Sequence, residues 1–199
     1  MTYPEFEAWW DQDAGRYGEW VDGVAIPFGR TSLRTAEVKT FLWTLVGCVV
    51  QRRDLGTGIG GLYQFQTRYG SLRIPDFMVI LKEHRDRLTE DRLIGPADVV
   101  FEVVTADSVT RDYSEKRYDY SCAGVPEYWI IDPRRGSEAI ELLLMHEEGY
   151  YAPAKPDEDG RYWSLLVPGV WIDPAWLLAD ELPDPVDLVL RMTDDALGL

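Results

Sequence analysis

Two acidic residues interrupt apolar runs of the kind that form buried strands. Asp76 precedes an unbroken apolar run in "RIPDFMVIL" (73–81), and Glu102 lies inside "ADVVFEVVT" (97–105). Such runs suit strands covered on both faces, where an acid without a partner is rare. If the strands are neighbours, the two carboxylates converge and repel unless a cation lies between them. Hard cations such as Mg²⁺ prefer oxygen ligands, so the pair predicts a metal site.

A simpler interpretation of the two acids stays open. Each could stand at a strand end, where backbone N–H groups or an arginine satisfy its oxygens. The recurrence of an acid in two consecutive strands is what favours the metal site over this alternative.

A lysine follows the second strand at helical spacing. Asp112, Lys116 and Tyr120 are four residues apart within "DSVTRDYSEKRYDYSCAG" (107–124), so they share one face of the predicted helix. Lys116 can then point toward the two carboxylates, where an ammonium could stabilise charge on a transferred phosphoryl group. The alternative is an exposed Asp112–Lys116 ion pair with a small structural effect.

A further acid lies in the first long helix, predicted over residues 32–50 with Ser32 as its cap. Glu37 is interpreted either as an additional acid of the site or as a charge at its rim. The apolar face of this helix is predicted from residues at helical spacing: Leu33, Phe41, Leu45 and Val49.

The remaining elements predict a mixed sheet flanked by helices, an α/β (mixed α+β) fold. We expect a hairpin around Asp22-Gly23, a strand at 126–132, and Gly124 ending the helix before it. The other expected elements are a helix at 4–13, a loop at 56–61, a strand at 62–69, a turn of helix within 82–96, edge strands after 138, a helix at 173–180 opened by Asp173, and a loosely held acidic tail at 181–199.

Composition sets further limits. The 199 residues, 46% of them hydrophobic, fit a single domain over 1–199. The net charge of −15 repels nucleic acid at long range. Cys48 and Cys122 are expected as reduced thiols, and the amino terminus has no signal-peptide pattern. No apolar run is long enough for a membrane helix, so a cytoplasmic protein is expected.

The segments "IPDFMVIL", "ADVVFEVVTADSVTRDYSEKRYDYSCAGVPEYWIID" and "YWSLLVPGVWID" resemble, in order and spacing, the Uma-two family. That family belongs to the restriction-endonuclease-like domains of the PD-(D/E)xK nuclease superfamily. The resemblance covers a core of about residues 17–180. It implies a restriction-endonuclease-like core that hydrolyses phosphodiester bonds in DNA with Mg²⁺ or Mn²⁺.

The resemblance also assigns roles to residues. Asp76 matches the Asp of "PD" and Glu102 the acid of "(D/E)xK", with the Val103 carbonyl as a third metal ligand. The superfamily lysine would fall at Val104, which cannot replace it; in this family it is placed on the following helix, where Lys116 stands. Asp112 and Glu37 are additional candidates, Glu37 because many superfamily members carry an acid on this helix.

Two other functions remain as alternatives. The first is a nuclease fold without activity that binds a protein partner through its aromatic residues. The second is a metal-dependent hydrolase of a small phosphoester, which suits the acidic surface. By the same resemblance, two copies of the chain could form a homodimer through edge strands such as 138–145. The tryptophans behind the first alternative are Trp9, Trp10, Trp163, Trp171 and Trp176.

Overall fold

The computed structural model describes residues 1–12 and 17–194. Its central layer is a six-stranded sheet in the order β11-β10-β9-β8-β6-β3. Only β8 and β9 pair in parallel, so the sheet is mixed. Its strands are β3 (Gly56–Gly60), β6 (Phe77–Leu81), β8 (Val99–Val103), β9 (Glu127–Ile131), β10 (Ile140–Met145) and β11 (Tyr151–Pro153).

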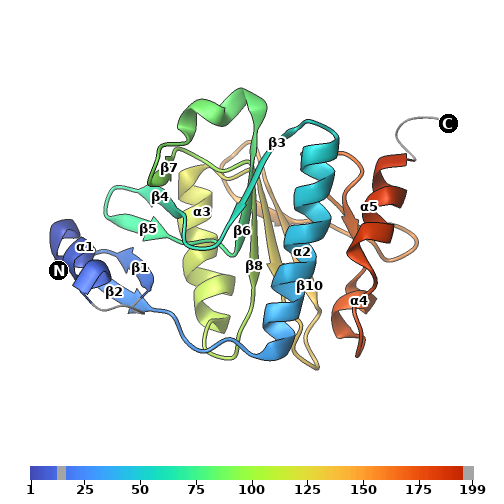
Figure 1. Cartoon of the computed structure of the whole chain (residues 1–199), viewed down its shortest axis with the longest axis horizontal. Helices are drawn as coiled ribbons and strands as arrows, with labels where there is room; N and C mark the ends of the chain where they lie inside the picture. Colours follow the sequence, from blue (N-terminus) through green and yellow to red (C-terminus); the bar gives the residue numbers. More distant parts are fainter. Residues whose placement is uncertain (13–16, 195–199) are drawn as a thin grey trace.

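A second, five-stranded sheet in the order β2-β1-β5-β4-β7 lies beside α3, at the N-terminal end of the molecule (Figure 1). It consists of β1 (Gly18–Val21), β2 (Val24–Pro27), β4 (Gln64–Arg68), β5 (Ser71–Arg73) and β7 (Arg92–Ile94). A separate pair is formed by β12 (Tyr162–Trp163) and β13 (Trp171–Ile172).

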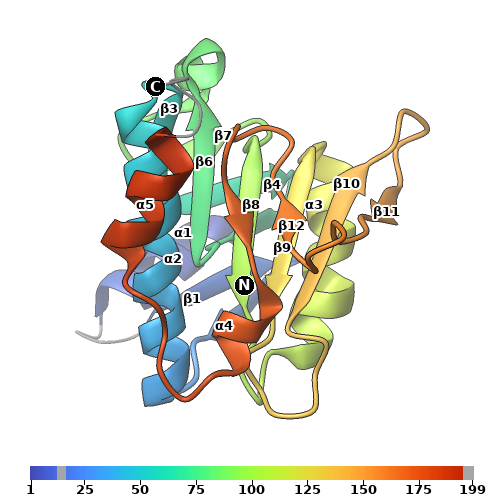
Figure 2. The same cartoon turned by 90° about the vertical axis from the view of Figure 1, so that its right-hand side faces the viewer.

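Helices cover both faces of the six-stranded sheet. Figures 1 and 2 show α2 on one face, with α5 packed outside it, and α3 on the other face. Within the described residues, no helix is long and apolar enough to cross a membrane. The helices are α1 (Tyr3–Gln12), α2 (Leu33–Arg52), α3 (Arg117–Ala123), α4 (Pro174–Leu178), α5 (Pro185–Asp194), a 3-10 helix η1 (Lys82–Arg87) and a π-helical turn η2 (Arg111–Lys116).

The apolar run of β6 is explained by this layering. Successive side chains of a strand point to opposite faces. Phe77 and Val79 join the core beneath α2, whereas Met78 and Ile80 join the core that includes Tyr120 of α3. A strand covered on both faces must be apolar throughout, as the sequence predicted.

Most predicted elements are present, and the mixed α/β class is confirmed. Ser32 caps α2 by accepting the Thr35 N–H at 3.1 Å, Asp22-Gly23 turns the first hairpin, and Gly124 ends α3 at φ +78°. The helical face of α2 was misassigned at its start, because Leu33 is 76% exposed. That residue belongs to the first turn, which extends past the sheet core.

The segment "GTGIGG" was predicted as a loop, and this prediction is wrong for residues 56–60. They form β3, paired antiparallel with β6. A Cβ on Gly58 would lie 2.6 Å from Phe77 Cζ, and one on Gly60 would lie 2.2 Å from a ring carbon of Trp43. The glycines therefore mark a strand on which large aromatic side chains pack closely, which local propensity does not reveal.

Two further expectations are corrected. Residues 185–194 of the acidic tail form α5, whose Leu188, Val189 and Met192 join the core against α2; residues 195–199 lie outside the described part. The segment 138–145 is not a free edge, because β10 pairs with both β9 and β11. β11 pairs with residues 143–145 of β10 only, so the homodimer expected from the sequence stays a prediction.

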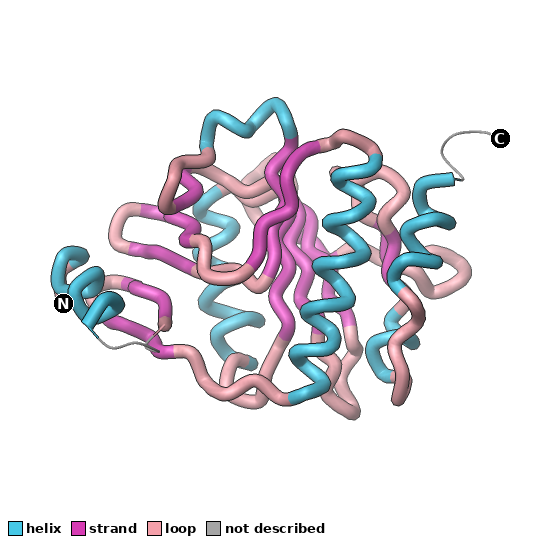
Figure 3. The backbone as a smooth tube through the Cα atoms, in the orientation of Figure 1, coloured by secondary structure: helices cyan, strands magenta, loops and turns pink. Residues whose placement is uncertain are grey.

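The loop 28–32 links the small sheet to the start of α2. Figure 3 traces it from the end of β2 along the end of the six-stranded sheet where β6 begins. Since β6 and β8 are antiparallel, the start of β6 and the end of β8 lie at this same end. The loop 28–32, the start of β6 and the end of β8 therefore lie together at one end of the six-stranded sheet.

Candidate active site

Asp76 and Glu102 meet at that end of the sheet. Phe77 pairs with Phe101, so Asp76 lies directly before β6, beside the last residues of β8. Asp76 Oδ2 accepts the Val103 N–H at 2.8 Å. The expectation that the strands carrying these acids are neighbours is confirmed. Asp76 also accepts a hydrogen bond from a backbone N–H, as the simpler interpretation expected.

Strand alternation turns Glu102 away from α2. Phe101 and Val103 belong to the core beneath α2, so Glu102, between them, points to the face covered by α3. Glu102 is 2% exposed, and its Oε1 accepts the Tyr120 hydroxyl at 2.5 Å and lies 2.8 Å from Lys116 Nζ. Among the described residues its other oxygen, Oε2, has no hydrogen-bond partner.

The helical spacing of Asp112, Lys116 and Tyr120 places Lys116 next to Glu102, as predicted. Asp112 and Lys116 are both buried, with 3.6 Å between Asp112 Oδ1 and Lys116 Nζ. Ser108 Oγ donates to Asp112 Oδ2. The alternative of an exposed ion pair is therefore wrong: this pair lies inside the protein, where each charge needs its partners.

A further acid, which was not predicted from the sequence, holds Lys116 in place. Glu19, on β1, is 1% exposed and places Oε1 3.2 Å from Lys116 Nζ. The same carboxylate accepts the Ile74 N–H at 3.1 Å and binds Arg73 at 2.8 Å. Arg73 in turn donates to Asp119 of α3 at 2.7 Å. The small sheet therefore fixes the lysine through a buried network of ion pairs.

A second lysine was also missed. Lys39 of α2 places Nζ 2.5 Å from Asp76 Oδ1. Glu37, proposed as an additional acid, is not brought into the site: it is exposed and lies 3.9 Å from Arg34. Two residues correspond to about 200° around a helix, so Lys39 and Glu37 lie on nearly opposite sides of α2.

These contacts set the ionisation of the buried groups. Burial raises the pKa of Glu102 to about 8, because the attraction of Lys116 does not outweigh it. Burial likewise raises the pKa of Asp112 above its usual value. For Glu19, the nearby cations Lys116 and Arg73 outweigh burial and lower its pKa. Burial alone would lower the pKa of Lys116, but the surrounding carboxylates raise it, so the lysine stays charged.

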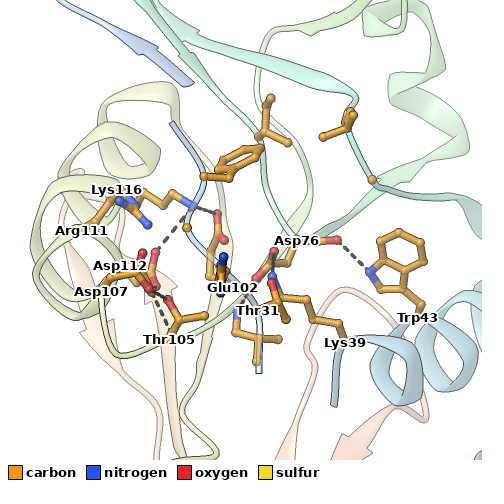
Figure 4. A pocket seen from close by; sticks show the side chains of 18 residues that line it. Thr31, Lys39, Trp43, Asp76, Glu102, Thr105, Asp107, Arg111, Asp112 and Lys116 are labelled. Atoms are coloured by element: carbon orange, nitrogen blue, oxygen red, sulfur yellow. Dashed lines mark hydrogen bonds and ion pairs between the residues drawn. The ribbon is translucent and has the colours of Figure 1, made fainter. Parts of the chain in front are cut away.

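The residues line an open cavity of about 260 Å³. Figure 4 shows Glu102 between Lys116 on one side and Asp76 on the other, with Lys39 and Trp43 beyond Asp76. Val103 also lines the cavity. Its charged lining residues are Arg30, Lys39, Asp76, Glu102, Asp107, Arg111, Asp112 and Lys116.

The donor set fits a hard divalent cation. Within residues 1–12 and 17–194, no three His, Cys, Asp or Glu side chains form a metal-binding group. The site instead offers two carboxylates, Asp76 and Glu102, beside Val103, whose carbonyl is a metal ligand only by the family resemblance stated above. Among the described residues, Oε2 of Glu102 has no hydrogen-bond partner, so this oxygen is open to a further ligand such as a hard cation. The ammonium of Lys39 already supplies one positive charge beside Asp76.

The fold is nuclease-like. The chain is similar to the crystal structure of a "putative nuclease belonging to DUF820" from Anabaena variabilis, with a TM-score of 0.68 and 14% sequence identity. The match covers 89% of this chain and 99% of the other. At this identity the likeness shows the fold alone.

The family follows from the sequence comparison. The model of the Uma2 family, described as "Putative restriction endonuclease", matches residues 3–175. The chain therefore belongs to the Uma2 family, and the resemblance stated from its motifs is confirmed. No curated protein matches the chain.

Proposed function

We propose that the chain is an endonuclease that hydrolyses phosphodiester bonds in DNA and requires Mg²⁺ or Mn²⁺. The observation that carries the proposal is the buried Lys116, held on Glu102 beside Asp76 in an open cavity. Membership of a family described as restriction endonucleases supports it. The cytoplasmic location and the homodimer expected from the sequence stay predictions.

Asp76, Glu102 and the Val103 carbonyl would hold the cation. A divalent cation in such a place neutralises charge on the phosphate and makes a water acidic enough to lose its proton near neutral pH. Burial raises the pKa of Glu102 and so favours its protonated form. Binding of the cation would therefore be coupled to release of a proton from this acid.

Lys116 would act on the reacting phosphate. Its ammonium has three donors, and Glu102 and Glu19 fix two directions for them, at 2.8 Å and 3.2 Å. The residue also lines the cavity, in which the phosphate would lie. A fixed cation there orients the attacking water and stabilises the negative charge that develops on the phosphate oxygens.

The experiment is the cleavage of supercoiled plasmid and single-stranded DNA at low salt, with and without Mg²⁺ or Mn²⁺. Wild-type protein is compared with Asp76→Asn and with the exposed control Asp86→Asn. Nicking that requires the cation and Asp76, and is retained in the control, is the expected result. If wild type cuts no DNA and divalent cations do not shift its melting temperature, the inactive interaction scaffold is the better account.

A further inference from the structure

The cavity has aromatic walls as well as charged ones. Trp43 of α2 and Phe28, from the loop after β2, each line it while remaining 39% exposed. In Figure 4 the indole of Trp43 stands next to Asp76. Large apolar rings left open to solvent beside a catalytic carboxylate point to a ligand that covers them.

The indole of Trp43 is held in place. Its Nε1 donates to the Asp76 carbonyl at 2.7 Å, which leaves its ring faces as the part not used in hydrogen bonding. The indole packs against Phe77, with ring centroids 6.3 Å apart, and against the bare backbone of Gly60, while 39% of the residue stays exposed. A ring fixed in this way is a preorganised stacking surface, since a ligand does not have to order it.

Basic and acidic side chains line the same opening in equal number: Arg30, Lys39, Arg111 and Lys116 against Asp76, Glu102, Asp107 and Asp112. Arg30, Lys39 and Arg111 line the cavity, and among the described residues Arg30 and Arg111 form no ion pair. The chain as a whole carries −15, so most of its surface repels phosphate. Proteins that bind duplex DNA through many phosphates need a wide basic surface. Attraction confined to one cavity suits a short stretch of a single strand.

We propose that the substrate of this site is single-stranded DNA, with one unpaired base stacked on Trp43 and neighbouring phosphates at Arg30 and Arg111. This inference rests on the proposed nuclease function. In a duplex both faces of each base are covered by its neighbours, so a base must leave the stack to meet a side-chain ring. Aromatic platforms combined with a basic groove are the usual means of holding single strands.

The test is the dissociation constant of a fluorescein-labelled single-stranded oligonucleotide and of the blunt duplex of the same sequence. Both are measured by fluorescence anisotropy in EDTA at low salt, so that no cleavage occurs. The variants are Trp43→Leu, Trp43→Phe and the matched control Trp163→Leu. Trp163 is 41% exposed, uses its Nε1 in a hydrogen bond, and does not line the cavity.

We expect wild type to bind the single strand more tightly than the duplex. Trp43→Leu should weaken single-strand binding about tenfold, the effect of losing one base stack, and leave duplex binding unchanged. Trp43→Phe should retain most of the affinity because it keeps a ring, and Trp163→Leu should behave as wild type.

Two results would overturn the inference while leaving the nuclease proposal intact. One is plasmid cleavage together with equal affinity for both DNA forms. The other is equal loss of affinity in Trp43→Leu and Trp163→Leu. Absence of both binding and cleavage with any DNA would instead remove the proposed function, and this inference with it.

Discussion

Glu102 and Glu127 are buried glutamates on neighbouring strands of one sheet, yet their surroundings differ. Glu127 accepts hydrogen bonds from neutral donors, namely Trp129 Nε1 at 2.6 Å and the N–H groups of Leu165 and Leu166 at 2.9 and 3.2 Å. Glu102 contacts a charged lysine and a tyrosine and lines a cavity. Burial raises the pKa of both acids.

The difference separates an acid whose oxygens are all bonded within the protein from one that keeps an oxygen open to a ligand. Every oxygen of Glu127 is engaged by the protein, and the contacts tie the start of β9 to the segment after β12. Among the described residues, Glu102 keeps one oxygen without a partner and faces solvent through the cavity. A raised pKa alone therefore does not identify a site; an open oxygen and a nearby fixed cation do.

The largest effect is expected from Lys116→Met. The substitution leaves Glu102 and Glu19 buried beside each other without their shared cation, and breaking such a pair costs about 3–5 kcal/mol. The free energy of unfolding from urea titration should fall by that amount, and cleavage should be lost. Unchanged stability would show that Lys116 does not compensate the buried carboxylates.

Glu102→Gln should remove activity with little cost in stability. The glutamine can still accept from Tyr120, and it replaces an acid whose pKa of about 8 already favours the neutral form at pH 7, so the unfolding free energy should change by about 1 kcal/mol or less. The cleavage rate should fall by more than the roughly 10–100-fold typical of substitutions at residues that contact metal ligands but not the metal itself. The shift of melting temperature by Mn²⁺ should also disappear, and its persistence would place the cation elsewhere.

Glu19→Gln tests whether the small sheet positions the lysine. Lys116 would keep Glu102 but lose its second anchor, so we expect kcat to fall roughly 10- to 100-fold while KM changes little. Glu19→Asp, which keeps the charge, should recover part of the rate. A change in stability without any change in kcat would make Glu19 a purely structural residue.

The smallest effect on activity is expected from Glu127→Gln. Its amide would place a donor against backbone N–H groups, at a cost of about 1–3 kcal/mol in the free energy of unfolding. Per folded molecule, however, cleavage should equal that of wild type. A loss of cleavage by folded Glu127→Gln would show that Glu127, like Glu102, is needed for activity.

The features predictable from the sequence are those encoded by local spacing. The interruption of an apolar run indicated Glu102, and four-residue spacing in a helix indicated Lys116, which the structure brings to within 2.8 Å of it. Asp76 was indicated because it precedes an apolar run. Their catalytic and metal-binding roles stay predictions.

The features that could not be predicted join distant segments. Glu19 reaches Lys116 only because β1 pairs with β5 and carries the small sheet against α3. Lys39 and Trp43 reach Asp76 because α2 crosses the start of β6, and nothing in the helix sequence encodes that crossing. The strand at 56–60 was missed because its glycines are explained by rings from other elements.

The most direct test of the account is the rate of Mn²⁺-dependent cleavage of single-stranded DNA and of supercoiled plasmid by Glu102→Gln and Glu127→Gln, each corrected for the folded fraction. The account predicts cleavage at the wild-type rate by Glu127→Gln and none by Glu102→Gln. Equal rates for the two variants, whether both retained or both lost, would contradict the assignment of Glu102 to the active site.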